Sequence, residues 1–170
     1  VKKLLLAAIG KSTDGRVFAR NLVATKIDED AAAGFYEKNH IQGQVGNPCI
    51  SYGLMDNAEL VAVMSFSRIT SLRGTRNTEG EFELRRYATS KKVIGGASKL
   101  LSYFVKETVN VTKIVSYSDN RLFSGGLYEK LGFSKDFVSK PSYWYVHPSR
   151  KVRFPKAAFK RSSLSKMKDF

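Results

Sequence analysis

Lys92-Val-Ile-Gly-Gly-Ala97 lies at the centre of the stretch that decides the fold, which runs from Glu83 to Phe133. This stretch predicts a strand, a Gly-Gly turn into a helix, a second strand and a second Gly-Gly turn into a helix. Backbone amides in the first turn of a helix lack partners and lie at the positive end of the helix dipole. Because Gly95 and Gly96 carry no side chain, a phosphate can come close to these amides. The turn is therefore a candidate phosphate site.

The flanking sequence completes an α/β pattern. A hairpin is predicted where Asp56-Asn57 joins two apolar strands, and a helix is predicted where acidic residues supply an N-cap. The predicted strands are residues 3–8, 17–24, 50–55, 60–66 and 143–146, and the predicted helix follows Asp28 as far as about residue 40.

Alternation along the strands predicts which side chains share a face. Glu83 and Arg85 are expected on one face, and Leu84 and Arg86 on the other, so at least one arginine faces the covered side of the sheet. A buried arginine needs a partner, and the expected one is Asp119, at the end of the next strand. In the second hairpin strand the expected apolar face consists of Leu60, Ala62, Met64 and Phe66, with Val61, Val63, Ser65 and Ser67 opposite.

The charge of the chain favours a nucleic-acid partner. The chain has 170 residues, enough for one domain, and 29 Lys and Arg against 15 Asp and Glu give a net charge of +14. DNA is the expected polyanion, although a membrane surface or simple solubility explains the same charge. The single cysteine, Cys49, fits a reducing compartment. No apolar run has the length of a membrane span and the first residues do not fit a signal peptide, so we expect a cytoplasmic protein with no membrane partner.

Two basic segments are candidate nucleic-acid contacts. The polar loop 68–80 is either a solvated hairpin connection or a flap that contacts phosphates. The composition changes after residue 146, which predicts a domain at 1–146 and a basic extension at 147–170. The extension carries spaced aromatic residues that either dock on a nucleic acid or pack on the domain. The candidate contacts are Arg68, Arg73 and Arg76 in the loop, and Arg150, Lys151, Arg153, Lys156, Lys160 and Arg161 in the extension.

The order of these elements, with the segment Leu127-Tyr-Glu-Lys-Leu-Gly-Phe133, resembles the GNAT (Gcn5-related acyltransferase) family. The resemblance implies an α/β (α+β) fold with a central mixed, mostly antiparallel sheet flanked by helices. In that family the turn before the central helix holds the pyrophosphate of acetyl-CoA, and a tyrosine often protonates the leaving thiolate. The resemblance therefore makes Tyr128 the proton donor. The expected binding residues for the cofactor are Lys92, Val93, Ile94, Gly95, Gly96 and Ala97.

The same segments, with Asn39-His-Ile-Gln-Gly43 and Pro141-Ser-Tyr-Trp-Tyr145, also resemble a phage-encoded domain found alone or attached to homing nucleases. That domain is similar in plan to the phage DNA-modifying enzyme Mom. The resemblance implies a transferase whose acceptor is a DNA base and whose site contains a His, an Arg, a Ser, an Asp and a Tyr. On matching elements of this chain these residues are His40, Arg86, Ser98, Asp119 and Tyr128.

Each candidate residue also has a structural explanation. His40 is a general base, a metal ligand or a polar residue at a helix end, and Asp119 either orients His40 or pairs with Arg86. Ser98 contacts a phosphate or caps the helix, and Tyr128 is a general acid or packs on the sheet. Two histidines and one cysteine far apart do not predict a metal site. The alternative functions are a non-catalytic DNA-binding module and an N-acetyltransferase acting on a protein or a small amine.

Overall fold

The computed structural model describes residues 15–45, 49–69, 79–120, 123–141, 143–146, 149 and 152–160. The chain forms two compact units, Val1–Phe133 and Ser134–Phe170. The boundary between the units lies earlier than the domain boundary expected after residue 146, so the last apolar strand belongs to the second unit. The strand predicted at residues 3–8 lies outside the described residues.

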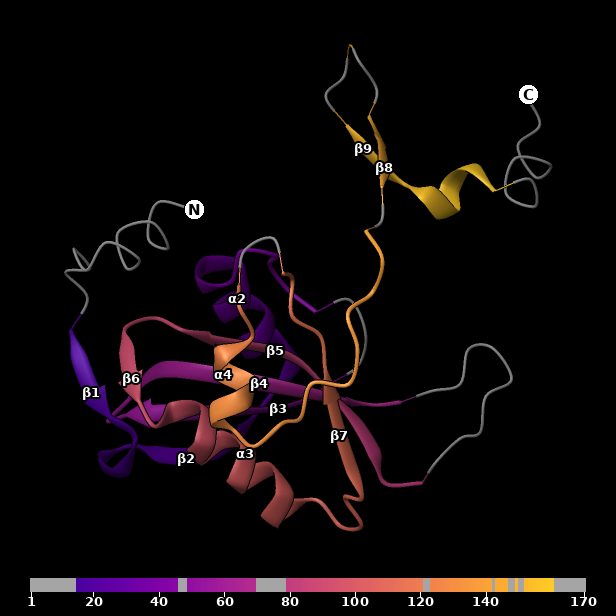
Figure 1. Ribbon diagram of the computed structural model, residues 1–170. Helices are drawn as coiled ribbons and strands as arrows, with labels where there is room; N and C mark the ends of the chain where they lie inside the picture. The colour runs from indigo at the N-terminus through magenta and orange to yellow at the C-terminus, as the bar shows by residue number, and fades with distance from the viewer. Residues whose placement is uncertain are drawn as a thin grey trace. The chain divides into compact units, whose positions relative to one another are not determined.

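The first unit is built on a five-stranded sheet with the order β2-β3-β4-β5-β7 (Figure 1). Its strands are β2 (Val23–Ile27), β3 (Ile50–Asp56), β4 (Glu59–Arg68), β5 (Glu81–Thr89) and β7 (Lys113–Ser116). Neighbouring strands are antiparallel except for β5 and β7, which are parallel. The predicted hairpin and the predicted mixed, mostly antiparallel α/β sheet are therefore confirmed.

The first unit also contains a second sheet of two short strands. Strand β1 (Arg16–Phe18) pairs in parallel with β6 (Lys92–Ile94). The single strand predicted at residues 17–24 is wrong, because the 3-10 helix η1 (Ala19–Asn21) separates β1 from β2. Because η1 changes the direction of the chain, β1 lies outside the main sheet and alongside β6 (Figure 1).

Helices cover both faces of the five-stranded sheet. On one face α2 (Glu29–Asn39) begins at its predicted cap, since the Asp28 carboxylate accepts a hydrogen bond from the Ala31 amide at 2.7 Å. On the other face α3 (Gly96–Glu107) follows β6, and the short α4 (Gly126–Lys130) follows β7. Figure 1 shows α2 and α3 on opposite sides of the sheet. Among the described residues, no helix combines the length and the apolar character that spanning a membrane requires.

The two faces have separate apolar cores. The core under α3 is the larger and contains Leu100 and Phe104 of that helix together with Met64 and Phe66 of β4. The core under α2 contains Phe35 and Tyr36 with Val63 of β4 and Ala88 of β5.

A bulge changes the predicted faces of β4. Ala62, Met64 and Phe66 lie in the α3 core as expected, but Val61 also lies there and Leu60 packs against the α2 core. The register with β3 shifts between Leu54 and Met55, which leaves one extra residue on β4. Since side chains alternate from one residue to the next, one extra residue exchanges the two faces beyond it. The prediction for Leu60 and Val61 was therefore wrong.

The second unit contains a small hairpin. Strand β8 (Trp144–Val146) pairs antiparallel with β9 (Arg153–Pro155), and the 3-10 helix η2 (Lys156–Phe159) follows. The strand predicted at residues 143–146 is thus confirmed, apart from its first residue.

Candidate functional site

The predicted Gly-Gly turn into a helix is present between β6 and α3. Gly95 is the N-cap of α3 and has φ 76°, a left-handed conformation that glycine adopts without strain, and no side chain caps the helix. At Gly96 a Cβ atom would lie 2.8 Å from Cγ1 of Val93 and 2.9 Å from the hydroxyl of Tyr87. The backbone therefore requires glycine at both positions. Burial raises the pKa of Tyr87 to about 12, so this hydroxyl beside the turn keeps its proton at neutral pH.

Residues 15–22 contact the turn from one side. The Lys92 amide donates to the Gly15 carbonyl at 3.1 Å, next to the pairing of β1 with β6. The Lys99 ammonium donates to the carbonyls of Ala19, at 2.9 Å, and Leu22. These contacts tie η1 and α3 together, and they place η1 beside Gly95.

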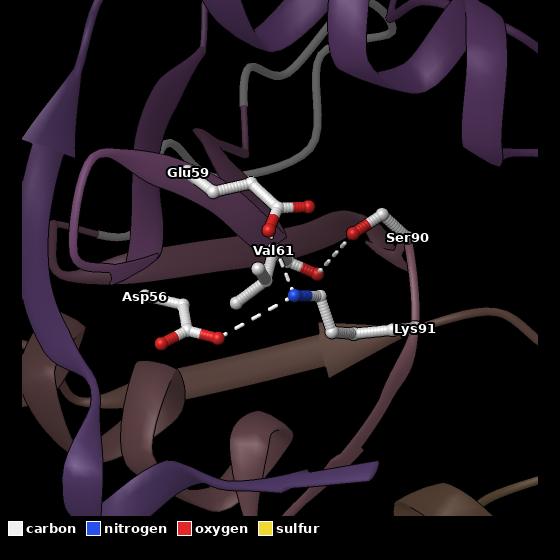
Figure 2. A network of polar contacts seen from close by, with 5 residues as sticks. All are labelled: Asp56, Glu59, Val61, Ser90 and Lys91. Atoms are coloured by element: carbon white, nitrogen blue, oxygen red, sulfur yellow. Dashed lines mark hydrogen bonds and ion pairs between the residues drawn. The ribbon is translucent and has the colours of Figure 1, made fainter. Parts of the chain in front are cut away.

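The end of β5 is attached to the β3–β4 hairpin (Figure 2). The Ser90 amide donates to the Val61 carbonyl at 3.0 Å. The Lys91 ammonium lies 2.8 Å from the Glu59 carboxylate and 3.4 Å from that of Asp56. The hydrogen bond with Glu59 is the main reason why the pKa of Lys91 is raised. This network fixes the point at which the chain leaves the main sheet and enters β6.

Strands β5 and β7 separate before β5 ends. They pair over four residues, from Glu81 with Lys113 to Leu84 with Ser116, and the Ser116 hydroxyl donates to the Leu84 carbonyl at 3.0 Å. Strand β5 continues to Thr89, and within the described ranges no strand pairs with this last part on the β7 side.

A second bulge lies on β5 at the point of separation. Ser65 of β4 pairs with Arg86 and Phe66 pairs with Leu84, so Arg85 is the extra residue. Paired residues share a face, and Arg86 thus lies on the same face as Ser65, opposite to Leu84. The prediction that Leu84 and Arg86 share a face was wrong, because a bulge shifts the alternation by one residue.

A chain of buried hydroxyl groups runs under α2. The Tyr36 hydroxyl lies 2.7 Å from the Ser65 hydroxyl, which lies 2.7 Å from that of Ser51. The Tyr36 hydroxyl also donates to the Arg86 carbonyl at 3.3 Å, and burial raises its pKa. These bonds join α2, β3, β4 and β5 around the bulge, and they fix the position of Arg86.

Replacing Ser65 by alanine is expected to lower the free energy of unfolding by about 1–3 kcal/mol, because it removes the bonds to two buried hydroxyl groups. Urea denaturation measures the change. Ser67→Ala is the matched control, since Ser67 lies two residues further along β4 and is only half-buried; it should change stability by less than about 0.5 kcal/mol. Equal losses in the two variants would contradict this role of Ser65.

The arginines next to the bulge carry unused hydrogen-bonding capacity. Arg85 forms an ion pair with Glu83 at 2.9 Å, and a guanidinium nitrogen of Arg86 donates to the Arg85 carbonyl at 3.1 Å. Within the described part of the chain, the Nε atoms of both arginines are buried without a hydrogen-bond partner. Such donors favour a ligand with acceptor oxygens at this position.

The structure brings His40 close to Arg86. His40 ends α2, its ring makes an edge-on contact with Tyr36 at 6.1 Å, and its pKa is lowered by burial and then by the charge of Arg86. Its Nδ1 accepts a hydrogen bond from the Gln42 amide at 3.2 Å. The neutral ring therefore carries its proton on Nε2, and that nitrogen acts as a hydrogen-bond donor rather than as a base.

The lowered pKa of His40 makes stability depend on pH. The unfolded chain takes up a proton near pH 6.5, whereas the folded chain does so only at a lower pH. Stability from this group is therefore lost as the pH falls below about 6.5. His40→Gln removes this contribution, so its urea midpoint should fall less than that of the wild type between about pH 7.5 and about pH 5.5. Equal losses would show that His40 does not titrate differently on folding.

The remaining predicted residues are Tyr128, Ser98 and Asp119. Tyr128 packs against the α3 core and contacts the Phe133 ring edge-on at 5.7 Å. Ser98 is exposed on α3, and Asp119 is half-buried after β7, where its carbonyl accepts a bond from the Phe123 amide at 3.0 Å. His40 and Arg86 are thus associated with the α2 side of the sheet, and Tyr128 with the α3 side. The proposed pairing of Arg86 with Asp119 stays a prediction.

Sequence reasoning missed four polar residues of this region: Tyr36, Ser51, Ser65 and Arg85. One signal was available, because Tyr36 lies four residues before His40 and therefore on the same side of α2. A shallow depression beside α2, lined by Asp30, Ala31, Gly34, Phe35, Lys38, Asn39, Leu60 and Ser90, contains none of the predicted site residues.

The basic candidates are only partly described. Arg68 is exposed at the end of β4, with its guanidinium 5.3 Å from the centre of the Phe82 ring. Arg153, Lys156 and Lys160 are exposed in the second unit. The remaining candidates, Arg73, Arg76, Arg150, Lys151 and Arg161, lie outside the described residues. The charge is uneven along the chain, because residues 134–170 contain ten of the 29 Lys and Arg but two of the 15 Asp and Glu.

Within the described ranges, no group of three or more His, Cys, Asp and Glu side chains is arranged to hold a metal ion.

No family model matches the chain, and no curated protein sequence matches it. In the arrangement of its backbone the chain is similar to an integron cassette protein from the mobile metagenome of V. cholerae. The two are 7% identical, the match covers 75% of this chain and 94% of that chain, and the TM-score is 0.49. A likeness at this level carries no argument about function.

Proposed function

We propose that the chain is a GNAT-fold transferase of phage type that modifies DNA bases in the host cytoplasm. It transfers a group to a base amine from acetyl-CoA, a related acyl-CoA or another phosphate-bearing donor. The observation that carries the proposal is the course of β5: it separates from its parallel neighbour after Leu84, bulges at Arg85, and leads through β6 into the uncapped glycine turn of α3.

The donor site uses main-chain groups from two places. The edge of β5 beyond Leu84 offers amides and carbonyls to an extended chain such as the amide-containing arm of CoA. The first amides of α3 offer donors to its pyrophosphate, and Lys92, exposed at the start of β6, adds a positive charge nearby. When bound, an acyl-CoA supplies a carbonyl group already activated as a thioester.

The acceptor side is assigned to the bulge. Arg86 and the Nε2–H of His40 are the proposed hydrogen-bond donors. The Tyr36 hydroxyl bonds to the Arg86 carbonyl, and His40 is held by the Gln42 amide and by ring contact with Tyr36. They suit the carbonyl and ring-nitrogen acceptors of a base or the oxygens of its phosphate. Tyr128, on the α3 side of the sheet where the donor turn lies, is the proposed general acid. The amine nitrogen bonds to the acyl carbon, the carbon–sulfur bond breaks, the sulfur takes the proton of Tyr128, and the proton that the amine nitrogen loses returns to the tyrosinate.

The glycine turn gives a direct test of donor binding. At about 100 times its Kd, acetyl-CoA is expected to stabilise the wild type by about 2.7 kcal/mol, measured as a thermal shift. Gly95→Ala should lose most of this gain, because a methyl group and a strained φ both disturb the amides that face the donor.

Gly125→Ala is the matched control. Gly125 is also a left-handed N-cap, with φ 84° and no other atom within 4 Å of the point where a Cβ would lie, but it precedes α4. Both variants should lose about 1–2 kcal/mol of stability from backbone strain. Only Gly95→Ala should lose the response to acetyl-CoA. An equal response in both variants would argue against a donor at the α3 turn.

The reaction itself is tested by mass analysis of nucleosides from the DNA of cells that express the chain. A new modified nucleoside is the expected result. Unaltered bases together with DNA binding would favour a non-catalytic DNA-binding module. Unaltered bases together with acetylation of proteins or small amines would favour an N-acetyltransferase of the ordinary kind.

A further inference from the structure

Aromatic rings contact one another on one face of the hairpin in the second unit. Tyr145 lies 4.6 Å from Phe159 and 5.6 Å from Tyr143, and Phe154 lies 5.8 Å from Phe159, measured between ring centres. Phe159 belongs to η2, which therefore folds back over the Tyr145 side of the two strands. These four rings contact one another on one side of the hairpin, where Tyr143, Tyr145 and Phe159 are 51%, 43% and 39% exposed.

The opposite face presents an aromatic ring and a positive charge. In an antiparallel pair, directly opposed residues share a face. Val146 is opposite Arg153, and Trp144 lies two residues before Val146, so these three side chains share the face that η2 does not cover. Trp144 is 54% exposed and Val146 is 60% exposed, and Arg153 is exposed as well. Trp144 and Val146 therefore form an exposed apolar patch beside the positive charge of Arg153, and such patches are typical of binding surfaces.

The charge around this face indicates the kind of partner. Residues 134–170 carry ten basic and two acidic side chains. Arg153 places one positive charge on this face, and the ammonium group of Lys156, 4.9 Å from the centre of the Tyr143 ring, places a second on the Tyr145 side of the hairpin. A flat aromatic surface beside cationic groups matches the bases and phosphates of a nucleic acid.

We propose that this face of the β8–β9 hairpin binds single-stranded DNA, with the Trp144 indole stacked on a base and Arg153 bonded to a phosphate. In a duplex, neighbouring bases cover both faces of each base, so an indole stacks only on an unpaired one. An enzyme that acts on a base must also reach it outside the stack. The inference rests on the DNA part of the proposed function, but it requires no catalysis.

Fluorescence tests the stacking directly, because Trp144 is the only tryptophan in the sequence. A short thymidine oligonucleotide is expected to quench the emission to saturation. A blunt duplex of the same length should require a concentration about tenfold higher, since its bases are covered. Polyphosphate, which has charge but no bases, should leave the emission unchanged. Equal quenching by all three would overturn the proposal, and so would a stronger response to the matching RNA or to vesicles of anionic lipid.

Variants are compared by the anisotropy of a labelled oligonucleotide. Trp144→Leu should weaken binding about 5- to 100-fold, and Trp144→Tyr, which keeps an aromatic ring, should recover most of it. Phe137→Leu is the matched control: Phe137 is 70% exposed in the same unit but outside the hairpin, and its loss should leave binding unchanged. Equal effects of Trp144→Leu and Phe137→Leu would overturn the proposal.

The contribution of Arg153 to DNA binding is measured by varying the salt concentration. Arg153→Gln should reduce the slope of the logarithm of affinity against the logarithm of salt concentration by the amount expected for about one phosphate contact. Lys135→Gln, outside the hairpin, should reduce this slope less. Wild-type protein that binds single strands as expected, while the DNA of cells that express it stays unmodified, would contradict the transferase and leave the hairpin site intact.

Discussion

Phe104→Ala is expected to lower the free energy of unfolding by about 3–5 kcal/mol. The Phe104 side chain is fully buried. Its ring stacks on that of Phe66 with centres 3.7 Å apart and meets the Phe82 ring edge-on at 5.1 Å. Removal of the ring leaves a cavity between α3 and two strands that cannot close without moving the helix. The same helix begins at the glycine turn, so the donor site depends on this packing.

Urea denaturation at equilibrium measures this loss. Val105→Ala is the control on the same helix, because Val105 is 48% exposed; its loss should stay within about 0.5 kcal/mol. If the alanine variant does not fold, Phe104→Leu should fold and show a smaller loss. A loss below about 1 kcal/mol for Phe104→Ala would mean that α3 does not pack on the sheet as described.

Tyr128→Phe is expected to reduce base modification by about 100-fold or more, because it removes the proposed proton donor and leaves the ring in place. The ring packs against the α3 core and against Phe133, and phenylalanine keeps these contacts. Melting temperature and DNA affinity should therefore stay close to those of the wild type. Modified nucleosides per unit of protein are the quantity to measure.

Tyr117→Phe provides the comparison for Tyr128. Tyr117 is 71% exposed directly after β7, so the same chemical change there should leave modification unchanged. Full activity of the Tyr128 variant would remove this residue from the mechanism. A loss of activity together with a lower melting temperature would assign Tyr128 a structural role only.

Local patterns predicted much of the fold. The hairpin at β3 and β4, the capped start of α2, and the glycine turn between β6 and α3 all appear where the sequence predicts them. Each depends on a short-range rule, such as alternation, capping or the freedom of glycine to adopt positive φ. Such rules act between residues close in the chain, which explains their success.

The two bulges and the pairing of β1 with β6 could not be predicted in this way. Leu60, Val61 and Arg86 changed faces because of one extra residue in β4 and one in β5, and no residue type marks either position. The hydroxyl chain of Tyr36, Ser65 and Ser51 joins segments far apart in the sequence. The candidate site on the α2 side therefore became recognisable only after tertiary packing was known.

The attachment of the glycine turn to η1 has a consequence for the order of folding. The bond from Lys99 to the Ala19 carbonyl joins residues 80 positions apart. During synthesis, Ala19 emerges from the ribosome well before Lys99, so this bond forms only after most of the first unit has been made. Closing so long a loop costs entropy that only later contacts repay. The turn should thus reach its final shape among the last parts of the first unit, and hydrogen exchange during refolding should show late protection of Lys92 relative to the strands of the main sheet.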